Sequence, residues 1–184
     1  MFYSTKFTDS EIQQFKEQTD QKNRALNYNN IDKDIKTRWI GVVCEAAFER
    51  WLKWKKLEYT YWPTKDKIDE LDFTVGQYNI DVKGVGTNYY PKPNYACNLC
   101  ENQYKKLLRP DNKINALVHA RFILPTNTVV LLGFISREKT IEKARFFKKG
   151  EKCGVIYLSS NNYEVPISEL QDLTNIFVPS EVIC

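Results

Sequence analysis

Histidine and methionine are nearly absent from this 184-residue chain, which contains one of each. A single histidine excludes metal centres that need two or more imidazole ligands from the chain. That histidine, His119, lies in an apolar run typical of a strand. We therefore expect it to be a core or sheet residue with satisfied hydrogen bonds rather than a catalyst.

Long apolar runs are also lacking, since no stretch approaches the roughly 20 residues of a membrane span. The N-terminal segment MFYSTKFTDSE has no basic region followed by an apolar one, so we expect neither membrane insertion nor secretion, but a cytoplasmic protein. Repeats, low-complexity tracts and linkers are missing as well. With 42% apolar and 14% aromatic residues, the sequence predicts a single domain over residues 1–184.

The five cysteines are odd in number and spread over a chain longer than small disulfide scaffolds, which indicates reduced thiols. Cys97 and Cys100 have the spacing of half a zinc site. No second C-x2-C or H-x3-H pair exists to complete the four ligands of a closed site. We therefore expect both to be unligated cysteines on a helix.

Positive charge is in modest excess, with a formal net charge of +4. It is gathered in three clusters, which could grip phosphate groups or simply keep helix faces in solvent. The clusters are Lys53, Lys55 and Lys56; Lys105, Lys106 and Arg109; and Lys143, Arg145, Lys148 and Lys149.

Hydrophobic spacing and turn residues predict an α/β chain with a mixed central sheet flanked by helices. The expected helices cover residues 8–26, capped by Asp9 or Ser10, 32–57, 96–108 and 137–150, with a final helical turn at 165–173 capped by Ser168. The expected strands cover residues 59–62, 71–75, 78–83, 115–124, 128–136 and 155–160, with a loop at 84–98.

The most informative pattern is D-x8-D-x-K, formed by Asp72, Asp81 and Lys83. The two acids fall on neighbouring strands of a hairpin that turns at Gly76-Gln77. Because side chains alternate along a strand, Asp81 and Lys83 share one face, and the apolar residues next to them point to the other. We expect the apolar face to anchor the core and the charged face to border a cleft.

This set of side chains suits a hard divalent cation such as Mg²⁺, which prefers carboxylate and carbonyl oxygens and retains several waters. Asp72, Asp81 and the backbone carbonyl of Val82 form a partial shell that a phosphate would complete. Lys83 is placed to orient a water or to stabilise charge on the phosphate in the transition state. Glu45, on a helix with small residues, could bind a second metal or act as a base.

A simpler alternative is that Asp72 and Asp81 are charges at the edge of a hairpin. Lys83 would then pair with one of them, and each interaction would contribute only about 0.2–1 kcal/mol.

These residues resemble the motifs of the PD-(D/E)XK nuclease superfamily, over roughly Gly41 to Ile135. The chain has a helix glutamate in GVVCEAAFERWL, an acid in ELDF, the segment IDVKG, and then a helix containing Gln103-Tyr104. The resemblance implies a restriction-endonuclease-like αβββαβ core and cleavage of DNA with Mg²⁺ or Mn²⁺. It also implies the catalytic residues, which would be Glu45, Asp72, Asp81, Lys83 and Gln103, with the three acids and the Val82 carbonyl as metal ligands.

The chain departs from the family's pattern at Leu71, where proline commonly precedes the acid, so Asp69 or Glu70 could take the place of Asp72. We expect an N-terminal helical segment over residues 8–30, the nuclease-like core over about 31–136 and a C-terminal extension of helix and strand over 137–184.

The implied function is that of a metal-dependent DNA endonuclease similar to small phage or resolvase-type enzymes, located in the host cytoplasm if phage-encoded. A homodimer is the simplest way to cut both strands. Two alternatives stay open. One is a DNA-binding or assembly protein that has the nuclease fold without turnover, and the other is an enzyme that acts on RNA.

The predicted loop at residues 84–98 is rich in glycine and tyrosine. Gly84 and Gly86 lack the rest of a Rossmann or P-loop motif, so we expect them to let the backbone approach DNA. Its tyrosines, Tyr89, Tyr90 and Tyr95, either stack on bases or pack over the edge of the sheet.

Overall fold

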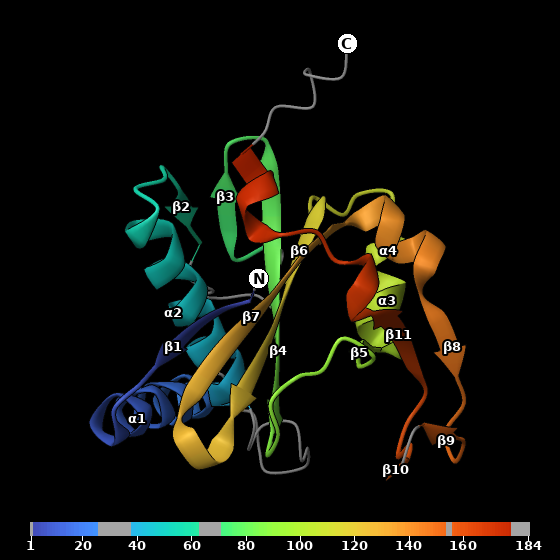
Figure 1. Cartoon of the computed structure of the whole chain (residues 1–184), viewed down its shortest axis with the longest axis horizontal. Coiled ribbons are helices and arrows are strands. Elements are labelled where there is room, and N and C mark those ends of the chain that lie inside the picture. Colours follow the sequence, from blue (N-terminus) through green and yellow to red (C-terminus); the bar gives the residue numbers. More distant parts are fainter. Residues whose placement is uncertain (1, 26–37, 63–70, 154–155, 178–184) are drawn as a thin grey trace.

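A curled, mixed sheet of six strands forms the centre of the computed structural model, which describes residues 2–25, 38–62, 71–153 and 156–177 (Figure 1). Across the sheet the order is β1 (Tyr3–Lys6), β7 (Thr128–Ser136), β6 (Ala116–Ile123), β4 (Tyr78–Thr87), β3 (Phe73–Val75) and β2 (Thr60–Tyr61). Strands β4 and β6 run parallel, and every other neighbouring pair in this sheet is antiparallel. The mixed α/β class expected from the sequence is confirmed.

The sheet is covered by different elements on its two faces (Figure 1). Helices α1 (Asp9–Ala25) and α2 (Arg38–Trp54) lie on one side. On the other side are α3 (Glu101–Leu107), α4 (Arg137–Lys143) and a second sheet in the order β5 (Ala96–Cys100), β11 (Asn162–Pro166) and β8 (Arg145–Phe147). The remaining elements are short, namely β9 (Lys152–Cys153), β10 (Ile156–Tyr157) and the 3-10 turns Leu124–Thr126, Ile167–Glu169 and Leu173–Phe177.

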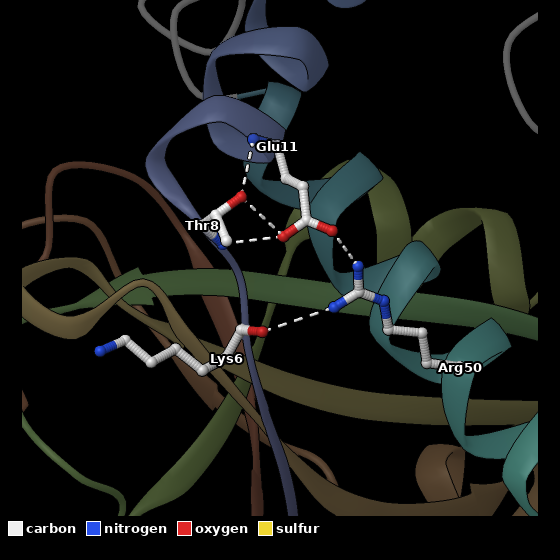
Figure 2. A network of polar contacts seen from close by, with 4 residues as sticks. All are labelled: Lys6, Thr8, Glu11 and Arg50. Carbon is white, nitrogen blue, oxygen red and sulfur yellow. Dashed lines mark hydrogen bonds and ion pairs between the residues drawn. The ribbon is translucent and has the colours of Figure 1, made fainter.

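Helix α1 begins with a reciprocal cap made by Thr8 and Glu11 (Figure 2). The backbone N–H of Glu11 donates to Thr8 Oγ1 at 3.2 Å, and the N–H of Thr8 donates to Glu11 Oε2 at 2.8 Å. This is a capping box, which satisfies two amide groups that the helix leaves unpaired. The predicted caps, Asp9 and Ser10, are wrong because the Thr8 hydroxyl lies three residues before a glutamate that completes the box.

The same glutamate joins α1 to α2 through Arg50 (Figure 2). The guanidinium of Arg50 pairs with Glu11 Oε1, donates to the carbonyl of Lys6 at 3.4 Å and lies 4.1 Å from the centre of the Phe7 ring. One side chain of α2 thus contacts both the end of β1 and the start of α1. The predicted peripheral helix is confirmed, but β1, which pairs with β7, was not anticipated.

Helix α2 packs tightly on β4, because two glycines face it. A Cβ added to Gly84 would lie 2.5 Å from Cys44 Sγ, and one added to Gly86 would lie 2.8 Å from Ile40 Cδ1. The prediction of a loop from residue 84 is therefore wrong, since β4 continues to Thr87 beside β6. The expectation that these glycines admit DNA is also wrong, as the space above them is filled by α2.

Several other predicted boundaries differ from the structure. Residues 96–100 form strand β5 rather than the first turns of a helix, because they pair with β11. The basic helix predicted over 137–150 ends at Lys143, and β8 follows it. Ser168 lies inside a 3-10 turn without a side-chain cap. The predicted start of α2 at residue 32 lies outside the described residues, as do Asp69 and Glu70.

The two predicted hairpins are confirmed. Gly76 has φ of 55°, a left-handed conformation that glycine adopts without strain, and it turns β3 into β4. The turn at residues 124–127 joins β6 to β7, with Asn127 at φ of 50°. A short strand also occurs within the predicted span 155–160, as β10.

Candidate active site beside strands β3 and β4

Asp72 and Asp81 lie close together at the open end of the β3–β4 hairpin. Phe73 pairs with Ile80, and Asp72, just before β3, bonds to the same residue, which directly precedes Asp81. The backbone N–H of Asp72 donates to the carbonyl of Ile80 at 2.9 Å, and the N–H of Val82 donates to Asp72 Oδ2 at 2.7 Å. Backbone bonds therefore fix both the main chain and the carboxylate of Asp72.

Lys83 forms an ion pair with Asp81, with 2.5 Å between Lys83 Nζ and Asp81 Oδ2. The predicted alternation is confirmed, because Ile80 and Val82 belong to the hydrophobic core under α2. Asp72 and Asp81 are only 6% and 5% exposed, so the two acids are buried rather than open to solvent as the expected cleft would require. The pairing with Lys83 gives Asp81 the compensation that a buried charge needs.

Glu45 projects from α2 close enough to act electrostatically on Asp72. Burial raises the pKa of Asp72 well above its usual value, and the negative charges of Glu45 and Asp81 raise it further. The Val82 N–H and Lys83 oppose this shift without cancelling it. The helix glutamate and both acids of the hairpin thus interact electrostatically, while their role as a site stays a prediction.

Tyr61 of β2 orients the Glu45 carboxylate, because its hydroxyl donates to Glu45 Oε2 at 3.1 Å. The pKa of Tyr61 is raised mainly by burial and then by the charges of Glu45 and Asp72. The sequence analysis did not assign Tyr61 to the site. The signal available was its place in the aromatic run 59–62, one strand away from Asp72.

The oxygen donors of this group suit a cation. Glu45, Asp72 and Asp81 bring three carboxyl groups together, and Lys83 pairs with Asp81. Carboxylate oxygens and a backbone carbonyl are the donors that Mg²⁺ prefers, with water completing its shell. However, within the described parts of the chain no three His, Cys, Asp or Glu side chains converge closely enough to hold a metal ion. The donor chemistry fits a magnesium ion, but the side chains would have to move to form its shell.

Gln103 lies at the start of α3, where it has a capping role. Its Oε1 accepts a hydrogen bond from the backbone N–H of Cys100 at 3.0 Å, and the two residues form a capping box. A contribution of Gln103 to the acidic group stays a prediction.

His119 is fully buried on β6, directly beside Lys83 in the parallel register. Burial, with further contributions from Arg121 and Lys83, lowers its pKa to about 3, so the imidazole is neutral. Its predicted core position is confirmed. Its hydrogen bonding is not as expected, because Nε2 has no partner among the described residues.

Members of all three basic clusters pair with acids on their own helices. Lys53 contacts Glu49 at 2.9 Å, Lys105 contacts Glu101 at 2.7 Å and Lys143 contacts Glu142 at 2.9 Å. These pairs favour the interpretation that the three lysines solvate helix faces, while Arg145, Lys148 and Lys149 lie beyond α4.

The two cysteines of the C-x2-C pattern have different environments. Cys97 is buried on β5, which raises the pKa of its thiol to about 12, while Cys100 is exposed. Residues three apart on a strand point to opposite faces, so these thiols cannot share a metal. They are strand residues rather than helical ones, and the prediction that they are unligated agrees with this geometry.

The tyrosines after β4 are open to solvent, with Tyr89, Tyr90 and Tyr95 exposed by 72%, 56% and 37%. Packing over the sheet edge, the second of the two expectations, therefore does not describe Tyr89 or Tyr90.

No helix of the described residues is long and apolar enough to cross a membrane. In comparisons with known proteins, no family model matches the chain, and no curated protein matches it either.

Proposed function

We propose that this protein is a metal-dependent deoxyribonuclease that hydrolyses phosphodiester bonds. The observation that carries the proposal is the grouping of Lys83, Asp81, Asp72 and Glu45, in which the buried Asp81, paired with the partly buried Lys83, adjoins two further carboxylates. Groups whose burial and neighbours shift their pKa in this way are concentrated at functional sites.

The order of elements around this group supports a restriction-endonuclease-like fold. The helix with Glu45 is followed by β2, β3 and β4, and later by α3 and β6, with β5 inserted before α3. Apart from that insertion, this is the αβββαβ order that the resemblance to PD-(D/E)XK nucleases implies. The proposal therefore rests on residue types and element order together.

Asp72, Asp81, Glu45 and the Val82 carbonyl would hold Mg²⁺ or Mn²⁺. Such an ion neutralises charge on a phosphodiester and lowers the pKa of water. Lys83 would leave its pairing with Asp81 far enough to contact the phosphate and stabilise the charge that grows there. Tyr61 would keep the Glu45 carboxylate directed toward Asp72. The hydrogen bond from the Val82 N–H would hold the Asp72 carboxylate in place before any substrate arrives, which reduces the reorganisation needed for reaction.

The second candidate is a DNA-binding or assembly protein with this fold and no turnover. It is favoured by the lack of a ready three-ligand group in the described residues and by the engagement of Lys83 with Asp81. RNA is a third possible substrate, because contacts to phosphate do not distinguish the sugar.

The test is cleavage of plasmid, four-way junction and single-stranded DNA, each with Mg²⁺ or with EDTA. Asp81→Asn and Lys83→Met should each lower the rate by about 100-fold or more, the effect typical of losing one group that stabilises transition-state charge. Asp111→Asn, which removes an exposed aspartate from a loop, is the matched control and should cut like the wild type. Equal rates in wild type and Asp81→Asn would refute the site, and no metal-dependent cleavage of any substrate would favour the binding protein.

A further inference from the structure

Trp62 lies beside Asp72, on the chain segment farther from Asp81. Tyr61 pairs with Phe73 in the register of β2 and β3, so the next position places Trp62 beside Asp72. The backbone N–H of Trp62 donates to the carbonyl of Asp72 at 2.8 Å. Asp72 bonds in turn to Ile80, which precedes Asp81, so Trp62, Asp72 and Asp81 lie on three neighbouring chain segments. At one strand spacing per step, the backbones of Trp62 and Asp81 are about 10 Å apart.

The indole of Trp62 is held in place while most of its surface faces solvent. Its Nε1 donates to Thr74 Oγ1 at 2.9 Å, and that hydroxyl donates to Asn79 Oδ1 at 3.1 Å. The residue is nevertheless 53% exposed. Because its one polar atom is already bonded within the sheet, the indole offers a fixed, largely apolar ring to a ligand.

A second exposed tryptophan, Trp54, lies in a different environment. Although it is 62% exposed, its ring stacks with Tyr3 at 5.6 Å between centroids, and the ammonium of Lys55 lies 4.1 Å from its centre. Trp54 thus already has ring and cation contacts within the protein. Trp54 provides a matched comparison for Trp62, because it is also exposed but does not lie beside the acids.

We propose that Trp62 stacks on an unpaired nucleobase of the substrate, adjacent to the phosphate at the acids. The inference rests on the proposed function and narrows the substrate class to nucleic acid with an unpaired base near the cut, such as a single strand or a branch. A separation of about 10 Å leaves room for a nucleotide whose phosphate lies at Asp81 and whose base lies against the indole. Bases inside a duplex keep both faces stacked on their neighbours, whereas unpaired bases present a face to aromatic side chains.

The test measures binding rather than cleavage, with Asp81→Asn as the parent protein so that the substrate stays intact. Fluorescence anisotropy is followed for a labelled single-stranded oligonucleotide and for its fully paired duplex, at fixed salt and Mg²⁺. Adding Trp62→Ala should weaken binding of the single strand about 5- to 150-fold, the range expected for losing one base–aromatic stack, and change duplex binding less than twofold. Trp62→Phe, which keeps a ring, should retain most of the affinity, and Trp54→Ala should behave like the parent.

An equal loss on both substrates, no loss on either, or a parent that binds no single strand would overturn the inference. Thermal unfolding of each variant separates these results from misfolding, and Trp62→Phe preserves the comparison if Trp62→Ala is unstable. The outcome is distinct from that of the proposed function. If the wild type cuts DNA but Trp62→Ala does not weaken single-strand binding, only the stacking proposal is refuted. If Trp62→Ala selectively weakens single-strand binding but no metal-dependent cleavage occurs, only the nuclease proposal is refuted.

Discussion

The two ends of the central sheet hold carboxylates in opposite electrostatic conditions. Beside β1, Glu11 is partly exposed and meets the Thr8 N–H, the Thr8 hydroxyl and the guanidinium of Arg50, which together lower its pKa. Beside β3, Asp72 is buried near two other acids, and its pKa is raised. The first carboxylate stabilises the fold through its charge. The second costs stability when it ionises, which is typical of residues kept for function rather than for folding.

The largest expected effect on stability comes from removing the partner of the buried Asp81 on β4. Lys83→Met leaves the buried Asp81 carboxylate without its ammonium, and breaking such a pair costs about 3–5 kcal/mol. Urea unfolding at pH 7 should show a loss of that size in the free energy of unfolding. The double variant with Asp81→Asn should recover much of it, because no unpaired carboxylate remains. A single Lys83→Met variant as stable as the wild type would show that Asp81 does not depend on Lys83 for its compensation.

An intermediate effect is expected from adding Mg²⁺. An ion that binds the native state at 100 times its Kd raises the free energy of unfolding by about 2.7 kcal/mol. Thermal unfolding with and without Mg²⁺ should show this gain for the wild type and its loss for Asp72→Asn. Glu11→Gln, which removes the carboxylate at the opposite end, is the matched control and should keep the gain. The same Mg²⁺ response in all three proteins would mean that the ion binds elsewhere.

The smallest effect is a difference in the pH dependence of stability. A lowered pKa means that the Glu11 contribution is present at neutral pH and lost as the pH falls below the usual range of a glutamate. A raised pKa means that the Asp72 contribution is favourable in acid and lost as the pH rises above the usual range of an aspartate.

Unfolding free energies of Glu11→Gln and Asp72→Asn, measured from pH 4 to 8, should therefore diverge from wild type in opposite directions. Near neutral pH, Glu11→Gln should lose about 0.2–1 kcal/mol, as expected for a partly exposed pair. Asp72→Asn should gain stability there. Parallel pH profiles for the two variants would show that the two carboxylates do not differ as described.

The hairpin that carries the acids was predictable because its signals are local. Gly76 supplies the turn, and the alternation of Ile80, Asp81, Val82 and Lys83 determines which side chains enter the core. The prediction that Glu45 lies near these acids came from the family resemblance and from the small residues on α2. Each of these inferences required only neighbours in sequence or a known order of elements.

The elements that sequence reasoning missed depend on distant partners. Judged from their sequence neighbours alone, Gly84 and Gly86 indicate the end of a strand. In the structure β4 continues through them, because β6 pairs with this segment and α2 occupies the space that larger side chains would fill. Strand β1 exists through its pairing with β7. Trp62 was left out of the site because its closeness to Asp72 arises only when β2 pairs with β3.

The close approach of α2 to β4 links the packing of the core to the chemistry of the site. Gly84 directly follows Lys83. A Cβ at this position would clash with Cys44, which directly precedes Glu45. A residue larger than glycine at position 84 would push the helix outward and carry Glu45 away from Asp72. The distance between Glu45 and Asp72 thus depends on having glycine at position 84. A substitution there would alter the site without changing any of its acids.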